Sequence, residues 1–319
     1  MARLVVLRGG RSMERDVSLA TGRRVAHALQ RLGHEVHELD LEERLTETLV
    51  ELSPDAAFVC LHGIGGEDGT VQALLEALGI PYTGSGPHAS VRCSDKDYAK
   101  RLLISAGLPT PPFRTFTRRA MREMGAAAAL EPAASGLGYP LAVKPCREGS
   151  GLGLSRVEGA EALPDAVYEA FGYDTKILLE RWVEGTEIAV PILEPPGEPP
   201  RALGLVEIRP PEGAYYDFQA KYTPGATDFA IPAEIPPEDA ARVEETALTA
   251  YRTLGCSSFA RVDLVLEGET PWVLDVKTIP GFTETSTLPL AAEAAGLDFD
   301  ELVATILETA LEQEVAAKL

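Results

Sequence analysis

The chain has 319 residues, which at about 150 residues per domain suggests two or three domains. Its 29 Lys and Arg residues against 49 Asp and Glu residues give a formal charge of −20, and such a surface repels nucleic acid and anionic lipid. With 45% hydrophobic residues, 24% charged residues and no apolar run near the ~20 residues of a membrane span, the composition is that of a globular protein without nucleic-acid or membrane partners.

Strand-like runs alternate with helical patterns at the start of the chain. No signal peptide precedes the first run, at 4–7, so we expect a cytoplasmic protein. Because parallel strands need a crossover connection, the alternation predicts a parallel α/β sheet, whose boundary we place near residue 95. A helix follows the first run and ends near Gly33, and the pattern continues at 36–39, 41–52, 56–60, 71–78 and 80–82.

The pattern beyond residue 95 predicts an α+β arrangement. The Ala-rich stretch 126–134 is interpreted as a helix end and a loop. The stretch 210–232 has no periodicity, and a loop of this length in a compact domain is usually functional or disordered. Helices are expected at 96–108, 160–171, 237–254 and 299–311, and strands at 141–144, 154–157, 176–180, 187–193, 258–266 and 272–276.

The four cysteines lie far apart, without a C-x-x-C or Cys/His spacing. This distribution argues against both a disulfide framework and a zinc site. We therefore expect four small buried side chains at Cys60, Cys93, Cys146 and Cys256.

A glycine-rich loop follows the predicted strand that ends at Lys144. Its sequence, K-P-C-R-E-G-S-G-L-G over 144–153, lets backbone N–H groups converge on an anion while the lysine adds a charge, as a nucleotide phosphate requires. It is neither a P-loop nor a dinucleotide fingerprint, because no Gly-Lys-Ser/Thr ends it and no helix follows. A β-hairpin turn explains these ten residues equally well.

Two predicted strands carry charged residues two positions apart. Because alternate strand residues share a face, Arg261 lies beside Asp263, and Asp275 beside Lys277. Adjacent strands would bring the two carboxylates together, which predicts a magnesium site close to a bound phosphate. A structural salt-bridge cluster is the commoner explanation of this pattern taken alone.

Glycine-rich loops also follow two strands of the predicted parallel sheet, at 9–15 and 62–69. Open parallel sheets bind ligands beyond the carboxyl ends of their strands, so these loops predict a pocket. A lone histidine in a loop is more often solvated than a ligand contact, and it is the position of His62 at this edge that makes it a candidate.

Taken together, these segments resemble the D-alanine:D-alanine ligases of the ATP-grasp superfamily over essentially the whole chain. Each piece is weak alone, but their order and spacing are specific. The segments are G-G-R-S-x-E-R-x-V-S-L at 9–19, H-G-x-G-G-E-D-G-T-V-Q at 62–72, P-Y-T-G-S-G at 81–86, D-K at 95–96, V-K-P-x-R-E-G-S at 143–150, E-R-W-V-E-G-T-E at 180–187, Y-D-F-Q-A-K-Y at 216–222, A-R-V-D at 260–263 and T-I-P-G-F-T-x-T-S at 278–286.

The resemblance implies a fold and an activity. The fold is ATP-grasp: a parallel, Rossmann-like α/β domain at 1–95, a central ATP-binding α+β domain at 96–185, and a C-terminal domain with the metal and substrate site at 186–319. ATP phosphorylates the carboxylate of a first D-alanine, and the amine of a second attacks the acyl phosphate to give D-alanyl-D-alanine for peptidoglycan. The resemblance implies ATP and one or two Mg²⁺ ions as cofactors, D-amino acids as substrates, and a homodimer.

The resemblance also assigns the nucleotide and metal residues. The metal ligands are Asp263 and Asp275. Three lysines match those that hold the ATP phosphates, and four further residues match the adenine and ribose contacts: Lys96, Lys144 and Lys221, then Glu180, Trp182, Val183 and Glu187.

The catalytic and amino-acid residues are assigned in the same way. Arg261 and the Gly281 N–H match the groups that stabilise the oxyanion of the tetrahedral intermediate. Glu14 matches the residue that binds the first ammonium, and its partners Ser150 and Tyr222 close the 210–232 loop as a water-excluding lid. The remaining substrate residues are Val17, His62, Ser286 and Thr287.

The chain departs from the family at the metal site, where Glu-x-Asn is replaced by Asp275-Val276-Lys277. A charged lysine has no acceptor and cannot bind magnesium. Three explanations are open: one of two magnesium ions is lost and Lys277 supplies its charge, the site is catalytically crippled, or a neighbouring group replaces the missing ligand. We favour the first, because the residues on the substrate side are intact. Smaller departures are Gly151 for serine and Ser94 for methionine, whereas Thr287 makes the acceptor pocket more polar and leaves the second amino acid open.

Two other functions remain: an ATP-grasp ligase of altered amino-acid specificity, and a nucleotide-binding pseudoenzyme with a degraded metal site. Phosphate release with a panel of D- and L-amino acids separates the two ligases. ATP binding without amino-acid-dependent turnover would indicate the pseudoenzyme.

Overall fold

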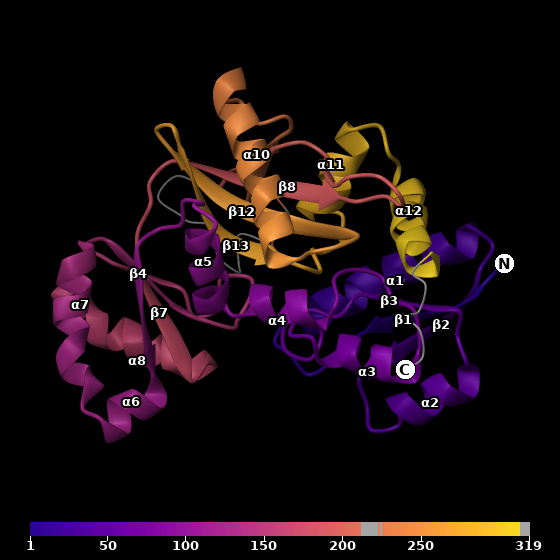
Figure 1. Cartoon of the computed structure of the whole chain (residues 1–319), viewed down its shortest axis with the longest axis horizontal. Helices are drawn as coiled ribbons and strands as arrows, with labels where there is room; N and C mark the ends of the chain where they lie inside the picture. The colour runs from indigo at the N-terminus through magenta and orange to yellow at the C-terminus, as the bar shows by residue number, and fades with distance from the viewer. Residues whose placement is uncertain (212–222, 224, 313–319) are drawn as a thin grey trace.

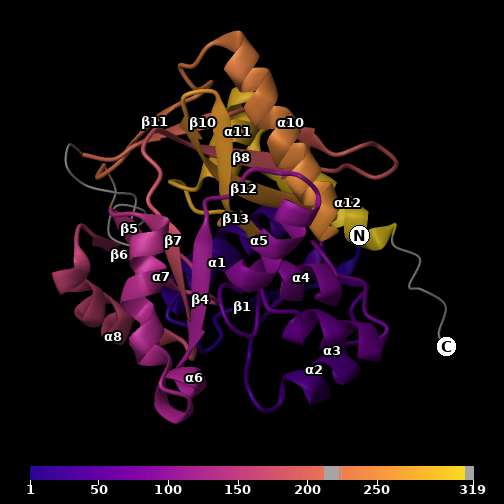
Figure 2. The same cartoon turned by 60° about the vertical axis from the view of Figure 1, so that its left-hand side comes forward.

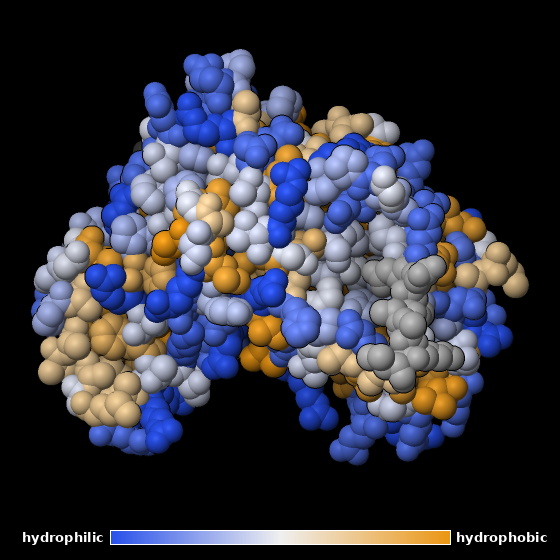
Figure 3. All heavy atoms as spheres, viewed as in Figure 1, coloured by the Kyte–Doolittle hydropathy of each residue, from blue (hydrophilic) through white to orange (hydrophobic). Residues whose placement is uncertain are grey.

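Three lobes, each built on its own β-sheet, make up this computed structural model, which describes residues 1–211, 223 and 225–312 (Figures 1 and 2). The N-terminal lobe is at the right of Figure 1, the central lobe at the left, and the C-terminal sheet spans the top. The face in Figure 3 is hollowed between the two lower lobes. No helix in the described part of the chain is long and apolar enough to cross a membrane.

The N-terminal lobe confirms the predicted parallel sheet, with strand order β2-β1-β3. Alternate residues of β1 enter different cores: Val5 and Leu7 pack with α2 and α3, whereas Leu4 and Val6 pack with α1 and the C-terminal α12. The 80–82 run makes only one bridge, Ala57 to Tyr82. The elements are β1 Arg3–Arg8, α1 Arg15–Arg31, β2 Glu35–Asp40, α2 Leu45–Leu52, β3 Ala56–Val59, α3 Thr70–Leu78 and α4 Pro87–Ser94.

The central lobe is an antiparallel sheet of order β4-β7-β5-β6 with α7 and α8 packed on it. The interpretation of 126–134 as a helix end and loop was wrong, because these residues form a 3₁₀ turn and most of α7, where Ala134 is buried. The elements are α5 Lys96–Ser105, β4 Phe113–Thr117, α6 Arg118–Glu123, η1 Ala126–Ala129, α7 Leu130–Leu137, β5 Leu141–Pro145, β6 Ser155–Val157, η2 Ala160–Ala162, α8 Leu163–Tyr173 and β7 Lys176–Arg181.

The C-terminal lobe is an antiparallel sheet of order β11-β10-β8-β12-β13, with β9 paired to β8. Its β8 strand alternates between two cores: Ile188 and Val190 face α10, whereas Ala189 and Leu193 face α11 and α12. The elements are β8 Thr186–Leu193, β9 Arg201–Ala202, β10 Val206–Arg209, β11 Asp228–Ala230, α10 Pro237–Leu254, β12 Phe259–Glu267, β13 Thr270–Lys277, α11 Thr287–Ala294 and α12 Phe299–Leu311.

Contacts between lobes cross the proposed domain boundaries. Helix α5 begins at Lys96 but packs against α10 and β13 of the C-terminal lobe, and α12 packs against α1 and β3 of the N-terminal lobe. We keep 1–95, 96–185 and 186–319 as a proposed division. The four cysteines are buried and unbridged, as predicted.

Candidate active site

A cavity lies between the sheets of the central and C-terminal lobes, and we call it the inter-sheet cavity. Strands β5 and β7 form one wall, and β8, β10, β12 and β13 form the other. Six residues that the resemblance assigns to ATP line it: Lys96, Lys144, Glu180, Trp182, Val183 and Glu187. The glycine-rich loop joins the antiparallel strands β5 and β6, so it is the turn of a β-hairpin, and its residues 148–152 also line the cavity. The hairpin explanation and the phosphate-site explanation of this loop are therefore compatible.

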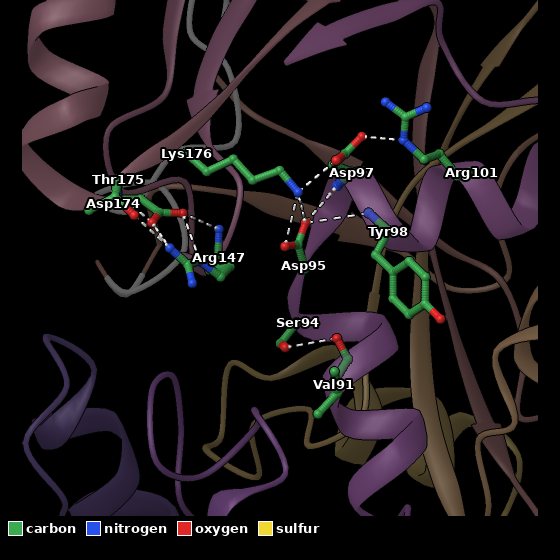
Figure 4. Close-up of polar contacts among 10 residues, drawn as sticks. All are labelled: Val91, Ser94, Asp95, Asp97, Tyr98, Arg101, Arg147, Asp174, Thr175 and Lys176. Carbon is green, nitrogen blue, oxygen red and sulfur yellow. Dashed lines mark hydrogen bonds and ion pairs between the residues drawn. The ribbon is translucent and has the colours of Figure 1, made fainter. Parts of the chain in front are cut away.

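Lys96 is fixed by the cap of its own helix. Asp95 precedes α5 and accepts a hydrogen bond from the Asp97 N–H, 3.1 Å away (Figure 4). The ammonium of Lys176 on β7 contacts the carboxylates of both Asp95 and Asp97. The Lys96 ammonium donates to the carbonyl of Glu148 at 2.7 Å. The first turn of α5 is thereby tied to the central sheet, with Lys96 directed into the glycine-rich loop.

Ser94, which stands where the resemblance implies a methionine, makes its hydrogen bond within α4. Its hydroxyl donates to the Val91 carbonyl of the same helix at 3.2 Å (Figure 4). Beside it, Arg147 in the glycine-rich loop makes a two-point ion pair with the buried Asp174, which anchors the start of the loop to the end of α8. Neither of these two contacts involves the lysines that line the inter-sheet cavity.

Glu180 lies between two lysines at the floor of the inter-sheet cavity. Lys144 donates to Glu180 Oε1 at 2.7 Å, and the wholly buried Lys100 pairs with Oε2 and also donates to the Thr110 hydroxyl. Burial lowers the pKa of Lys100 to about 8, while the two lysines outweigh the burial of Glu180 and hold its pKa below the usual range. Sequence reasoning missed Lys100, although its i, i+4 spacing from Lys96 places both on one helix face.

Four charges form a square on the facing strands β12 and β13. Arg261 lies opposite Lys277 and Asp263 opposite Asp275, so each charge faces a like charge on the neighbouring strand. Like charges opposite one another are destabilising unless other partners compensate. Arg261 makes a two-point ion pair with Asp263 at 2.6 and 2.7 Å, and Lys96 lies 3.6 Å from Asp275.

Magnesium fits this square only in part. Asp263 and Asp275 provide adjacent oxygen donors of the kind that magnesium prefers. Lys277 has no acceptor, and among the described residues no three His, Cys, Asp or Glu side chains gather as a metal cluster. The residues present therefore suit one ion at the carboxylate pair, and a second ion would lack the ligand that the resemblance implies at position 277.

Lys277 is held by a chain of buried polar groups. Its ammonium lies 2.7 Å from Glu67 Oε2, and Glu67 Oε1 lies 3.3 Å from His62 Nδ1. His62 Nε2 is 3.4 Å from the Thr21 hydroxyl. Burial favours the neutral amine, but Glu67, Glu14 and Asp275 together outweigh it and raise the pKa of Lys277. Glu67 is a second residue that sequence reasoning missed, although it belongs to the same glycine-rich loop as His62.

A second cavity, which we call the loop cavity, lies where the three lobes meet. Its wall combines Glu14 just before α1, the glycine-rich loops 62–69 and 144–153, residues of β12 and β13, and the segment 279–287. Seven of the expected residues line it: Glu14, His62, Ser150, Arg261, Gly281, Ser286 and Thr287. Ser150 lines both cavities. Val17, on α1, lines neither cavity, so its assignment as a substrate contact rests on the resemblance alone.

The glycine-rich loop approaches Glu14 closely. Ser150 donates a hydrogen bond to Glu14 Oε1 and adopts φ 56°, a left-handed conformation that is uncommon outside glycine and is often found at functional sites. A Cβ at Gly149 would clash with the ammonium of Lys277 and with Glu14. Glycine at this position is what allows the loop to reach both side chains.

Residues just before α11 and at its first position line another part of the loop cavity. Ser286 accepts a hydrogen bond from the Thr283 N–H at 3.0 Å, and its hydroxyl occupies the space that a Cβ at Gly281 would need. Thr287 is buried, and its hydroxyl has no hydrogen-bond partner among the described residues. The predicted Lys221 and Tyr222 lie outside the described residues.

Family models identify the chain. The model described as the D-ala D-ala ligase C-terminus matches residues 102–308, and the model of the N-terminus matches 41–85. The chain belongs to the D-alanine–D-alanine ligase family. D-alanine–D-alanine ligases of Desulforudis audaxviator and Geobacter sulfurreducens are 43% and 44% identical to it, over 98% and 96% of this chain and 99% and 93% of theirs.

Solved structures of the D-alanine–D-alanine ligase family share the ATP-grasp fold of this chain. The Bacillus anthracis D-alanine–D-alanine ligase complexed with ATP is 33% identical, with a TM-score of 0.80 and 98% of each chain covered. The VanG D-Ala:D-Ser ligase of Enterococcus faecalis is 30% identical, with a TM-score of 0.79, covering 96% of this chain and 98% of that one. Both the family and the fold that the sequence predicted are confirmed.

Proposed function

We propose that the chain is an ATP-dependent ligase that joins two D-alanine molecules through an acyl phosphate, for peptidoglycan synthesis. The observation that carries this proposal is the meeting of two cavities at one wall. The inter-sheet cavity, with its lysines, suits a nucleotide, and the loop cavity, with the Glu14 carboxylate and Arg261, suits an amino acid. A phosphoryl group leaving the nucleotide therefore has an amino-acid carboxylate within reach.

In the first step, the γ-phosphoryl group of ATP passes to a carboxylate oxygen of the first D-alanine, and ADP is released. Lys96 and Lys144 would hold the phosphates, which are anionic throughout the transfer. A magnesium ion, when bound by Asp263 and Asp275, supplies positive charge beside the phosphates. Glu14 would bind the ammonium of the first D-alanine and so orient its carboxylate.

In the second step, the amine of the second D-alanine attacks the carbonyl carbon of the acyl phosphate, and as the amide forms the nitrogen loses a proton and phosphate leaves. The oxygen of the tetrahedral intermediate bears a negative charge that Arg261 and the Gly281 N–H would stabilise. The loop anchored through Ser150 would keep water away from the acyl phosphate.

A second candidate is a ligase whose acceptor amino acid carries a polar side chain. The buried hydroxyl of Thr287 in the loop cavity favours it: this hydroxyl has no hydrogen-bond partner in the part of the chain that the structure describes, and a ligand group would supply one. The similarity to the VanG D-Ala:D-Ser ligase is compatible with such an acceptor.

The experiment is phosphate release by the full chain with ATP, Mg²⁺ and a panel of D- and L-amino acids, singly and in pairs. Turnover greatest with D-alanine alone supports the proposal. Greater turnover when D-alanine is paired with another amino acid indicates the second candidate. ATP binding without amino-acid-dependent turnover would identify a pseudoenzyme.

We further propose that the ligase works as a homodimer in the cytoplasm. The dimer rests on the resemblance to the family, and the cytoplasmic supply of ATP supports the location. Sedimentation equilibrium at micromolar concentration tests the dimer, and a single monomeric species would contradict it.

A further inference from the structure

We infer that Lys277 is a catalytic residue of this ligase that contacts the phosphoryl group as it passes from the nucleotide to the amino-acid carboxylate. The inference rests on the proposed function. The resemblance alone does not suggest this role, because it implies a neutral asparagine at this position. Position, restraint and charge each carry part of the argument.

The position of Lys277 lies on the path of transfer. The inter-sheet cavity and the loop cavity have three lining residues in common: Ser150, Arg261 and Lys277. A third cavity, which opens between α4, the 63–68 loop and Arg147, shares with both of them only Lys277. A phosphoryl group that starts in the nucleotide and ends on an amino-acid carboxylate must cross this shared wall.

The ammonium of Lys277 also adjoins the phosphate cradle itself. It lies so close to Gly149 that a Cβ there would clash with it. The N–H groups of this glycine-rich loop are the ones expected to converge on phosphate oxygens. Lys277, at the end of β13, therefore lies beside the expected anion site.

Lys277 and Arg261 form a pair of like charges on facing strands. Each cation has a carboxylate partner of its own, Asp263 for Arg261 and Glu67 for Lys277, and these partners offset part of the repulsion between the two cations. An anion between the two cations would convert this repulsion into attraction on both sides. Because catalysis depends on interactions stronger in the transition state than in the ground state, a cation pair aimed at the transferring group is an effective arrangement.

The restraint on Lys277 is what a catalytic cation needs. Its side chain is 12% exposed, and Glu67, backed by His62, holds the ammonium at 2.7 Å. A flexible lysine would lose rotamer entropy on meeting its substrate, whereas this one is ordered beforehand. Glu67 is thus a positioning residue that acts through Lys277.

The test follows the first step by trapping the acyl phosphate of D-alanine with hydroxylamine, which gives a hydroxamate. We expect Lys277→Met to lower the rate of hydroxamate formation by about 100- to 1000-fold, as for other lost oxyanion donors. The affinity for the β,γ-methylene analogue of ATP, measured by calorimetry, should change by less than about threefold, because the ground state is bound by other groups. Lys277→Arg, which retains the charge, should recover at least about tenfold of the lost rate.

Removing Lys277 leaves Glu67 as an uncompensated buried charge, which can unfold the protein. The double variant Glu67→Gln/Lys277→Met removes both charges and keeps the test valid. Arg242→Met on α10, which removes an exposed cation paired with Asp239, is the control for the loss of a cation outside the cavities. A folded Lys277→Met variant, alone or combined with Glu67→Gln, that forms hydroxamate within about threefold of the wild-type rate would overturn the inference. A wild-type chain that forms no hydroxamate with any amino acid would instead overturn the proposed function.

Discussion

The hydroxyl of Ser150 in the central lobe donates a hydrogen bond to the carboxylate of Glu14 at the start of α1, 136 residues earlier in the chain. This contact joins the glycine-rich loop of the inter-sheet cavity to the residue expected to bind the first ammonium. Both side chains are buried, so the contact is made in a poorly solvated environment. Occupancy of the nucleotide and amino-acid sites is thereby expected to be coupled.

Ser150→Ala tests this coupling. Loss of a hydrogen bond to a charged group costs about 1.5–3 kcal/mol, so we expect KM for the first D-alanine to rise by about tenfold or more. ATP hydrolysis without dipeptide formation should increase, because the loop closes less completely. Ser135→Ala, which removes an exposed serine bonded to Glu131, is the matched control. An unchanged ratio of ADP to dipeptide would contradict the role of the contact.

For Arg261→Ala we expect a loss of turnover far greater than the loss of ATP affinity. The guanidinium is matched to an oxyanion that exists only near the transition state, an effect of roughly 3 kcal/mol for comparable donors. Steady-state kinetics measures the turnover, and calorimetry with an ATP analogue measures the affinity for the nucleotide. Equal losses in both would assign Arg261 to ground-state binding of the nucleotide.

The number of metal ions should depend on Lys277. If its charge replaces one magnesium ion, Lys277→Asn restores a ligand, raises the number of ions bound with nucleotide and keeps the enzyme active at high Mg²⁺, unlike Lys277→Met. Asp275→Glu combined with Lys277→Asn is the cleaner variant, because near-octahedral magnesium demands oxygen ligands at ~2.1 Å. Crystals with an ATP analogue give the count. Two well-coordinated ions in the unmodified protein would rule out charge replacement.

Because of Lys100, the free energy of unfolding should change with pH in the alkaline range. Burial lowers its pKa from 10.5 to about 8, so between these values the unfolded chain binds more protons than the folded protein. The contribution of this group to the free energy of unfolding therefore increases as pH rises from 8 to 10.5, by about 3 kcal/mol in total. Urea unfolding across this range should give a rising difference between the wild type and Lys100→Met. A difference that stays flat with pH would contradict the lowered pKa.

Thr287→Val removes a buried hydroxyl without a partner among the described residues. Because an unsatisfied buried polar group costs about 1–3 kcal/mol, we expect the free variant to unfold at a higher temperature than the wild type. The KM for the second amino acid should increase at the same time, and more for D-serine than for D-alanine if the acceptor is polar. A higher Tm with unchanged kinetics would exclude Thr287 from acceptor binding.

The sequence by itself determined the elements with strong periodicity. The apolar run at the start of β1 and the amphipathic pattern of α10 lie where they were expected, because local patterns of period 2 and 3.6 decide which faces are buried. The same period placed Arg261 beside Asp263, and the structure joins them in an ion pair. Helices α4 and α11 escaped detection, because both are short and are rich in small residues and proline.

The order and spacing of the segments also determined the family. Residue types and intervals along the chain are enough for this, since they are a property of the sequence. Through the resemblance, they also identified six residues expected to contact ATP. The structure places all six in one cavity.

Only the tertiary structure decided which charges meet. Glu67 and Lys277 are 210 residues apart, and no local pattern links them. Their contact depends on how the N-terminal lobe packs against β13, and that packing is set by the apolar cores that α1, α12 and β8 share. The Glu67–Lys277 pair depends on this packing, because burying a charged ammonium is costly unless the fold places a carboxylate beside it.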